Sequence, residues 1–447
     1  MSQNLSDLTQ TLLSAAKRHG ADAADAVAAI SDSLSIGVRA GELEQAERSE
    51  STDVGLRVII GQKQATVSGS DLTPDGLETM AERAVQMAKL APDDPFIGLA
   101  DAAALSDVRD ASGLDLEDTH EPEPKALEEA ALAMEAAALA VAGVDQVSSA
   151  GGGYGRSTFH LAASNGFEGG YSGTSHSLSC VAISGTGLEM ERDYYFDSRM
   201  HHADLTAPEE IGKRAGDRAA ERAGPRKAKT GAYPVLYDER VSSGLVGHLM
   251  SAINGSAIAR GASWLKDAMG EQVLPAHFSV IEEPNRPRTG GSRPFDGEGL
   301  PVSNRAWVDE GKLTGWVLDL ATARKLGLES TGNASRGVGG TPSPSLSNLS
   351  LTQGHQSREE LLKEMGEGLL VTSLIGSSIN PNTGDYSRGA SGFWVENGEI
   401  AYPVNECTIA GNLREMLMTL TAANDARPHL SRVVPSLRVE GLTIAGG

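Results

Sequence analysis

The chain has 447 residues, of which 40% are hydrophobic, 22% are charged and only 4% are aromatic. This length exceeds what one hydrophobic core supports and predicts two or three domains. The 60 Asp and Glu residues outnumber the 38 Lys and Arg residues, which gives a net charge of −22. Such a surface repels phosphate backbones and anionic lipids, so nucleic acids and membranes are not expected as partners.

The two cysteines, Cys180 and Cys407, are too few for a disulfide scaffold or a cysteine-rich metal site. Pairing between them stays open, but free thiols in a reducing cytoplasm are the favoured interpretation. Residues 1–20 lack the basic and apolar regions of a secretory signal. No apolar run approaches the ~18 residues that span a bilayer. We therefore expect a cytoplasmic protein.

Residues 1–95 are predicted to form an N-terminal α/β domain that begins with a helix followed by a hairpin. Apolar residues recur at helical spacing over residues 5–18. Residues 34–38 alternate between apolar and small or polar side chains, which is typical of a half-buried strand. The turn is expected at residues 40–41.

The same predicted domain continues with a strand pair over residues 55–69, with Gly61 in its turn. A second helix is expected after Thr73 as N-cap, with Pro74 in its first turn. One face of this helix carries the apolar residues Leu77, Met80, Ala81, Ala84, Val85 and Ala88.

Residues 96–226 are predicted to form a central α/β segment. An acid- and proline-rich stretch over residues 113–124 precedes an Ala/Glu-rich helix that runs to about residue 142. Asn165-Gly166 lies between two alternating runs and is the strongest hairpin signal in the chain. A helix over residues 208–223 is expected to close this segment.

Residues 227–447 are predicted to form a β-rich C-terminal domain that starts with a strand at 234–237 and contains many glycine turns. Few helices are expected in it besides residues 241–260 and 357–365. Hairpins with a central glycine are expected over residues 305–320 and 391–404. The fold class predicted for the whole chain is α+β.

One histidine, His248, lies inside the apolar run of the predicted helix over residues 241–260. Zinc peptidases place two histidines and a glutamate on a helix, where the glutamate acts as base on the metal-bound water. Residues 243–248 read Ser-Gly-Leu-Val-Gly-His, so only His248 offers a ligand and no acid accompanies it. A zinc site stays open on these residues alone, but a histidine packed in a core or an interface is favoured.

Other motifs that carry chemistry are weak. No other histidine lies in an H-x-x-H or H-E-x-x-H pattern, and the neighbours His201 and His202 would point to opposite faces of a strand. There is no G-x-S-x-G or Walker A motif, and the glycines of residues 151–156 lack dinucleotide-binding spacing. Cys407 has no His or Lys close in sequence, so we expect a buried thiol.

Two glycine-rich stretches, residues 288–301 and 382–400, hold charged and aromatic residues in predicted loops. A structural turn is the simpler interpretation. The sharper one is the lining of a peptide groove, because small residues let another backbone approach closely. The candidate lining residues are Arg293, Phe295, Asp296, Glu298, Asn382, Asp385 and Arg388.

Several ordered motifs resemble the TldD/TldE (PmbA) family. They include "TGAYPVLYD", "GLVGHLMSAINGSAIARGASWLKDAMGEQV", "RPFDGEGLP", "ARKLGLESTGNASR", "SNLSL", "NTGDYSRGASGFWVENGEI" and "PSLRVEGLTIAGG" in the C-terminal half. "GELEQAERSESTDVGLRVIIGQKQATVSGSDL" and "AASNGF" extend the resemblance toward the N-terminus. It thus covers essentially the whole chain.

The resemblance implies a subunit of a heterodimeric zinc metallopeptidase. The catalytic type carries His-Glu-x-x-x-His on a C-terminal-domain helix and a third ligand, a cysteine, near its C-terminus. On this sequence the first histidine falls at Ser243, the glutamate at Gly244 and the second histidine at His248. The region of the cysteine reads "RPHLSRVV" (residues 427–434), and Cys407 lies well before it.

The chain therefore resembles TldE/PmbA, the non-catalytic partner, with His248 as a vestigial ligand position. The resemblance implies that this chain binds no metal, that zinc lies in a TldD-like partner, and that the complex degrades unfolded peptides. Trimming of a microcin-type precursor and turnover of an antitoxin are the implied roles. The alternatives are a non-proteolytic binding protein that acts on DNA gyrase or an antitoxin system, and an independent hydrolase.

Overall fold

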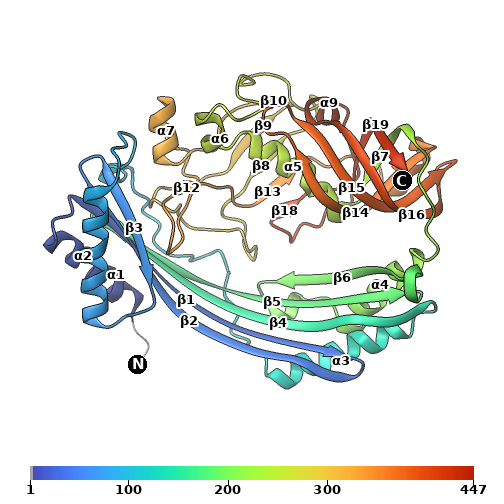
Figure 1. Ribbon diagram of the computed structural model, residues 1–447, viewed down its shortest axis with the longest axis horizontal. Coiled ribbons are helices and arrows are strands. Elements are labelled where there is room, and N and C mark those ends of the chain that lie inside the picture. Colours follow the sequence, from blue (N-terminus) through green and yellow to red (C-terminus); the bar gives the residue numbers. More distant parts are fainter. Residues whose placement is uncertain (1–3, 447) are drawn as a thin grey trace.

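The computed structural model describes residues 4–446 and combines a long antiparallel sheet with a β-rich C-terminal domain (Figure 1). The long sheet has the strand order β3-β2-β1-β4-β5-β6. Its first part consists of α1 (Leu5–Arg18), β1 (Ala23–Arg39), β2 (Glu42–Ile60), β3 (Lys63–Gly69) and α2 (Pro74–Leu90). Its second part consists of α3 (Pro124–Leu139), β4 (Val144–Ala163), β5 (Glu168–Ser184), β6 (Glu191–Arg199) and α4 (Pro208–Glu221).

Local signals explain where these elements begin and turn. Thr73 caps α2 by accepting a hydrogen bond from the backbone N–H of Gly76 at 3.1 Å. Ala40 and Gly41 join β1 to β2 with φ of 54° and 77°, and a two-residue turn with positive φ at both positions matches the twist of a hairpin. The tip of this hairpin is held by Glu135 of α3, whose carboxylate accepts hydrogen bonds from both turn N–H groups at 2.7 and 2.8 Å.

All four helices of this half cover one face of the long sheet. Alternate residues of β1 point to that face, so its first residues pack under α1 and α2, while Leu34 and Ile36 pack with Leu127 of α3. The opposite face meets the C-terminal domain at one end, where Phe295 packs against Phe167. Further along it carries exposed serines, namely Ser31, Ser33, Ser35, Ser149, Ser175 and Ser179.

The C-terminal domain is built on a sheet with the order β16-β15-β14-β7-β19-β17, which an additional β16–β19 pairing closes on itself. Its strands are β7 (Gly231–Tyr237), β14 (Gly368–Ile379), β15 (Asp385–Glu396), β16 (Glu399–Asn412), β17 (Thr421–Ala422) and β19 (Leu437–Gly446). Its helices are α5 (Glu239–Ala252), α6 (Gly255–Ala259), α7 (Leu320–Leu326), α8 (Arg358–Met365) and α9 (Leu413–Met418).

Short strands complete this domain. The order β10-β9-β8-β13-β18 forms a second sheet, and β11 pairs with β12. These strands are β8 (Val280–Glu282), β9 (Arg305–Asp309), β10 (Lys312–Leu313), β11 (Ala334–Ser335), β12 (Ser343–Pro344), β13 (Leu349–Leu351) and β18 (Arg432–Val433). None of the helices within residues 4–446 is long and apolar enough to cross a membrane.

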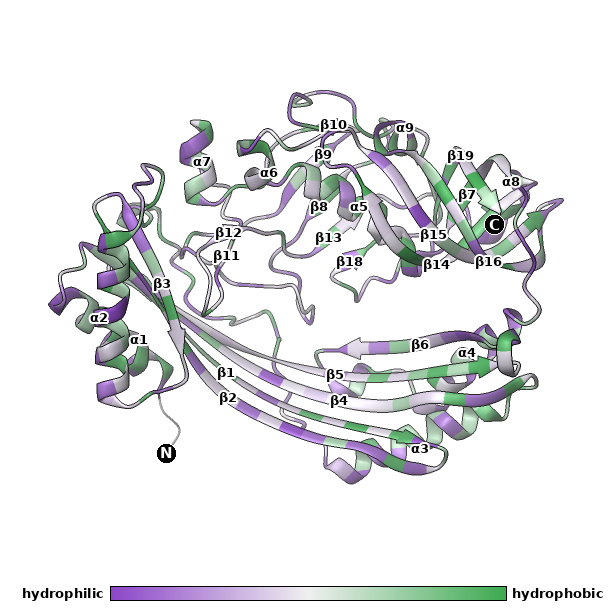
Figure 2. Ribbon diagram, in the orientation of Figure 1, coloured by the Kyte–Doolittle hydropathy of each residue, from purple (hydrophilic) through white to green (hydrophobic). Residues whose placement is uncertain are grey.

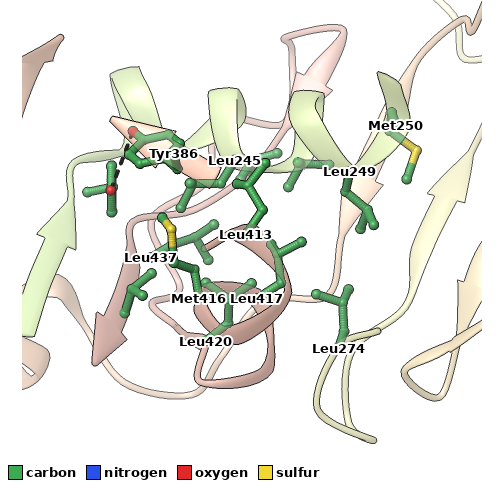
Figure 3. Close-up of a cluster of buried hydrophobic side chains, with 14 of the residues drawn as sticks. Leu245, Leu249, Met250, Leu274, Tyr386, Leu413, Met416, Leu417, Leu420 and Leu437 are labelled. Carbon is green, nitrogen blue, oxygen red and sulfur yellow. Dashed lines mark hydrogen bonds between the residues drawn. The ribbon is translucent and has the colours of Figure 1, made fainter. Parts of the chain in front are cut away.

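The largest hydrophobic core lies inside the C-terminal domain and fixes α5. Leu245 of α5 lies against Leu413 of α9, and Leu249 and Met250 lie further along α5 in the same hydrophobic cluster, which also contains Met416 of α9 (Figure 3). All five side chains are buried. Because these buried contacts fix one side of α5 in the core, they also fix the direction in which its opposite side faces.

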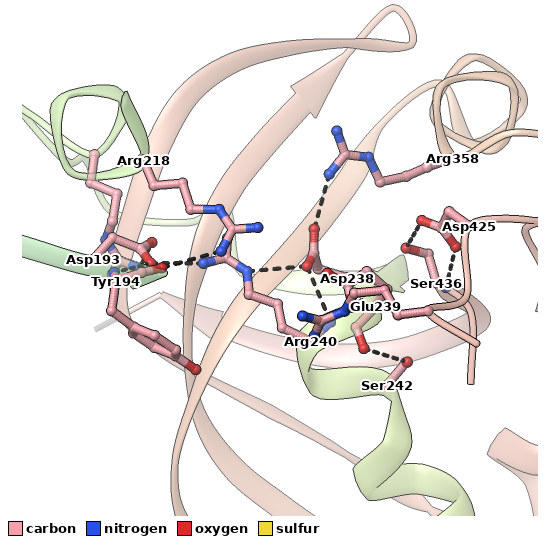
Figure 4. A network of polar contacts seen from close by, with 12 residues as sticks. Asp193, Tyr194, Arg218, Asp238, Glu239, Arg240, Ser242, Arg358, Asp425 and Ser436 are labelled. Carbon is pink, nitrogen blue, oxygen red and sulfur yellow. Dashed lines mark hydrogen bonds and ion pairs between the residues drawn. The ribbon is translucent and has the colours of Figure 1, made fainter. Parts of the chain in front are cut away.

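A buried ionic network joins the long sheet to the C-terminal domain (Figure 4). Arg240 of α5 donates hydrogen bonds to Asp193 of β6 at 2.7 Å and to Asp238 at 3.1 Å. Arg358 of α8 donates to the other oxygen of Asp238 at 3.0 Å. Buried charged side chains are stable only when opposite charges pair with them, as these carboxylates and guanidinium groups do.

The predicted α+β class is confirmed. The helices predicted over residues 5–18, after Thr73, over 124–142 and over 208–223 are present as α1, α2, α3 and α4, of which α3 ends at residue 139 and α4 at residue 221. The six apolar residues predicted for one face of α2 are all buried. The strands are longer than predicted, and α7 and α9 were not foreseen. The predicted division at residues 95/96 does not separate two sheets, because β1 pairs with β4 over residues 25–38.

Candidate functional site

Helix α5 presents the residues at the candidate metal-ligand positions along its partly exposed side. Ser243, Gly244, Gly247 and His248 are all half-buried, whereas the core side of the helix is buried. A Cβ added to Gly244 or Gly247 would meet no atom within 4 Å. This side of the helix therefore has room for larger side chains, and the sequence places glycine there without a packing reason.

The surroundings of His248 are aromatic and positively charged. Its ring lies 5.9 Å from that of Tyr386 in a T-shaped arrangement, and the Tyr386 hydroxyl lies 3.5 Å from that of Tyr237. Burial, together with the positive charge of Arg388, lowers the pKa of His248. Arg388 is held in place because its Nε donates to the carbonyl of Gly376 at 2.7 Å.

This set of donors does not fit zinc. Among residues 243–248 only His248 offers a nitrogen ligand, and no carboxylate or thiolate accompanies it. The positive charge of Arg388 near His248 would also repel a zinc ion. In the described part of the chain, no three His, Cys, Asp or Glu side chains are grouped so that they could hold a metal ion.

Cys407 lies on β16. It is buried, its thiol donates to the carbonyl of Ala390 at 3.2 Å, and burial raises its pKa to about 11. Cys180 is also buried, is not bonded to Cys407, and has a pKa raised by burial to about 12. Both thiols are therefore protonated and packed, as the sequence predicts for Cys407.

The segment after β17, where the resemblance places a third ligand, contacts other parts of the chain. Arg427 donates to Glu239 of α5 at 2.8 Å. His429 lies 3.5 Å from the carboxylate of Asp197 in β6. This segment therefore helps to join the C-terminal domain to the long sheet.

Three of the four candidate groove residues in 288–301 have buried side chains, and their groove role stays a prediction. Phe295, Asp296 and Glu298 are buried, because this loop packs onto the long sheet rather than against solvent. Asp296 accepts hydrogen bonds from the backbone N–H groups of Glu298, Leu300 and Ala334 at 2.9 to 3.0 Å. Its carboxylate organises the loop.

Glu298 has an unusual environment. Its Oε2 accepts a hydrogen bond from the backbone N–H of Leu320 at 2.9 Å. Burial, and then the neighbouring charge of Asp296, raise the pKa of Glu298 to about 8. Arg293, the fourth candidate, donates to the carbonyls of Ala334 and Ser345 at 3.2 and 3.0 Å and is half-buried.

The second glycine-rich stretch lies at the surface. Asn382 and Asp385 are exposed in the turn before β15 and at its first residue, and Arg388 is half-buried. Asp385 accepts hydrogen bonds from Thr383 and Asn412 at 2.6 and 3.1 Å. Of the seven candidate lining residues, the structure brings only Arg388 close to His248, and the groove role of Asn382, Asp385 and Arg388 stays a prediction.

A groove of about 330 Å³ lies between the serine-rich end of the long sheet and the beginning of the loop at residues 290–292. Sequence reasoning placed peptide binding near this loop but missed the sheet face. The alternation of serine at residues 31, 33 and 35 was the available signal. Residues that line the groove are Ser31, Asp32, Ser33, Leu116, Gly155, Arg156, Ser157, Tyr171, Gly173, Thr174, Ser175, Met200, Gly290 and Ser292.

A histidine cluster was also missed, because its members lie far apart in sequence. The ring of His202 lies 4.3 Å from that of His120 and 5.6 Å from that of His176. His176 is buried, its Nε2 lies 3.4 Å from Asp118, and burial lowers its pKa to about 4. The cluster fixes the segment before α3 against β5.

Comparisons with known proteins cover the whole length of the chain. Family models described as PmbA/TldA metallopeptidase domain 1, central domain and C-terminal domain match residues 24–88, 117–223 and 230–446. Metalloprotease PmbA of Escherichia coli O157:H7 is 37% identical over 95% of this chain and 92% of its own. The Metalloprotease PmbA homolog of Haemophilus influenzae is 35% identical over 99% and 96%.

Solved structures agree. A putative modulator of DNA gyrase from Bacteroides thetaiotaomicron superposes with a TM-score of 0.90 at 28% identity, over 99% of this chain and 98% of that one. TldE from Thermococcus kodakarensis has the same fold, with a TM-score of 0.84 at 22% identity over 98% and 99%. This chain belongs to the PmbA/TldA metallopeptidase family.

Proposed function

We propose that this chain is the non-catalytic, TldE/PmbA-like subunit of a heterodimeric, cytoplasmic zinc metallopeptidase. It binds no zinc itself, and the metal belongs to a TldD-like partner. The complex degrades or trims unfolded peptides, including a microcin-type precursor and an antitoxin. The observation that carries the proposal is the partly exposed side of α5, which presents Ser243, Gly244 and His248 with the positive charge of Arg388 nearby.

The chemistry of peptide hydrolysis supports this assignment. A zinc-bound water needs a general base, and Gly244 at the glutamate position has no side chain to take the proton. Losing one histidine and the cysteine removes two of three metal ligands. His248 keeps its place because it packs against Tyr386, which is a structural role.

A subunit without metal can still act on the substrate. A peptide held for cleavage is extended, and a second chain of related fold closes the groove and admits only unfolded segments. The groove between the long sheet and residues 290–292 suits such a role, because the Gly and Ser residues in its lining let an extended backbone approach closely. Related folds also pair about a pseudo-twofold axis.

The test is purification of this chain alone, and together with a catalytic TldD-type chain, followed by zinc analysis and a peptidase assay on an unstructured fluorogenic peptide. The chain alone should hold far less than one zinc per chain and cleave nothing. The mixture should cleave, and a zinc chelator should stop it. Chelator-resistant cleavage by this chain alone would instead identify an independent hydrolase.

The matched variant is His248→Ala. It should assemble with the catalytic chain and keep the activity of the complex within about tenfold, because the side chain has no ligand role here. A greater loss of activity in a complex that still assembles would contradict the vestigial role of His248.

A further inference from the structure

The long sheet has two edge strands, β3 with the outer half of β2 on one side and β6 on the other. β3 pairs only with residues 54–60 of β2. Residues 42–53 of β2 therefore pair with β1 on one side and with no strand of the described chain on the other. This free edge is about 40 Å long, at ~3.3 Å per residue.

The free edge is open to solvent on both faces. Residues 42–51 are all exposed. Helix α3 packs against β1, β4 and β5, and α1 and α2 cover only the other end of β2. Figure 1 shows β2 as the outermost strand along this margin, and Figure 2 shows much of it in the hydrophilic colour. Proteins normally shorten, bend or cover an edge of this kind.

The edge is also held rigid before any partner arrives. Glu135 clamps the turn at residues 40–41 to α3, and the β1–β2 register shifts only near that turn, between Gly37 and Val38. No proline interrupts residues 42–53. A strand fixed in this way pairs with a second strand without first becoming ordered.

The opposite edge differs. In β6 the backbone N–H groups of Tyr194 and Ser198 donate to the carboxylates of Asp193 and Asp197 at 2.7 and 3.0 Å. The carbonyl of Tyr194 accepts from Arg218 at 3.1 Å. Side chains of the protein thus occupy hydrogen-bonding groups of β6, which makes β2 the edge that is available.

Charge identifies what the free edge accepts. Residues 42–53 carry five acids, and Arg39 and Arg48 pair with two of them, Glu44 and Glu50. Glu42, Glu47 and Asp53 have no cationic partner among residues 4–446. Pairing with a second copy of this strand would place acids against acids, which is unfavourable. A strand that carries Lys and Arg has the complementary charge.

We propose that the outer edge of β2, residues 42–53, is a docking edge where a partner chain adds an extended strand rich in Lys and Arg to the long sheet. Main-chain hydrogen bonds supply the binding and the acids select the strand. The inference deepens the proposed function, on which it rests for the existence of a partner chain.

The test uses the full-length chain alone and a fluorescent peptide of about ten residues that alternates Lys and Thr. The peptide should bind, and backbone amides of residues 42–53 should become protected from hydrogen exchange while those of β6 do not. The same peptide with alternate N-methylated amides keeps its charge but cannot pair, so it should bind at least about tenfold more weakly. Equal binding by the N-methylated peptide, or no protection at residues 42–53, would overturn the proposal.

Charge reversal provides the matched comparison. Glu42→Lys/Glu47→Lys should weaken binding of the peptide at least about tenfold. Glu271→Lys/Glu329→Lys, which makes the same charge change at exposed residues elsewhere, should leave binding within about twofold. Equal losses in both variants would mean attraction to the net charge alone and would overturn the docking edge. Because no catalytic subunit is present, a negative result here leaves the zinc and peptidase test intact.

Discussion

The chain uses carboxylates in opposite ways in two regions that share the strands β1 and β2. Where the C-terminal domain meets the long sheet, Asp25, Asp296 and Glu298 are buried and accept hydrogen bonds from defined donors. Along the outer half of β2, Glu42 and Glu47 are exposed and unpaired with any cation among the described residues. The buried acids stabilise the fold through these hydrogen bonds, whereas the exposed acids are available to bind another molecule.

The difference teaches that an acid in a glycine-rich loop is a poor sign of a functional site. Asp296 and Glu298 lie in such a loop and hold it against the sheet. A regular strand with acids on both faces is the better candidate, because its carboxylates cannot be explained by internal contacts. Each prediction below tests one side of this contrast, from the largest expected effect to the smallest.

Asp25→Ala should have the largest effect on stability. Asp25 pairs with Arg57 of β2 and with Arg336 of the C-terminal domain, and all three side chains are buried. Removing the carboxylate leaves two guanidinium groups buried without their partner, which costs about 3–5 kcal/mol. Urea unfolding of the purified variant measures the loss. A change in unfolding free energy below about 1 kcal/mol would show that the pairing of Asp25 with the two arginines contributes little to stability.

Glu298→Gln should change how stability depends on pH. The folded pKa of Glu298 is about 8, above the ~4.3 of an unfolded glutamate. The stabilisation of the protonated form is therefore fully present below about pH 4 and is lost as pH rises through about 8. At pH 9 the variant, whose side chain stays neutral, should be more stable than the native chain by ~5 kcal/mol, and at pH 5 the difference should shrink to about 1 kcal/mol. Parallel unfolding profiles at pH 5, 7 and 9 would contradict this.

Glu135→Ala should free the tip of the β1–β2 hairpin. Both backbone N–H groups of the turn lose a charged acceptor, which costs ~2 kcal/mol. Hydrogen exchange should rise at residues 38–43 and stay unchanged in α5. Glu135→Gln, which keeps one acceptor oxygen, serves as the comparison and should lie between the variant and the native chain.

Glu47→Gln should have the smallest effect. The side chain is exposed and pairs with no cation of the described residues, so thermal or urea unfolding should change by less than about 0.5 kcal/mol. Its effect should show only on binding of a basic strand to β2. A loss of stability comparable to that of Asp25→Ala would erase the contrast between the two regions.

Local signals allowed much of the fold to be predicted from sequence. The capped α2, with its apolar stripe, and the Asn165-Gly166 turn depend on neighbours in sequence, so pattern and propensity suffice. The long strands did not follow in the same way. Residues 23–33 of β1 are rich in alanine, and their pairing with β2 and β4 rather than propensity makes them a strand.

In the candidate site, too, local features could be predicted from the sequence and contacts between distant segments could not. The sequence correctly indicated that His248 stands on a helix without a second histidine or a glutamate beside it. It did not reveal that Phe295 packs on Phe167 or that Arg388 lies near His248, since these contacts join distant segments. The free edge of β2 depends on the point where β3 stops pairing, which only tertiary structure defines.

The pairing of β1 with β4 also sets the order of events during synthesis. As the chain leaves the ribosome, β1 and β2 can form their hairpin early, but β4 follows only after α2, the linking segment and α3. Until then the inner side of β1 is a second unpaired edge, and nascent chains with such edges aggregate or engage chaperones. Long-range pairing of this kind slows folding. A fragment that ends at residue 95 would keep that exposed edge permanently, so the matched region 24–88 is no independent unit for transplantation.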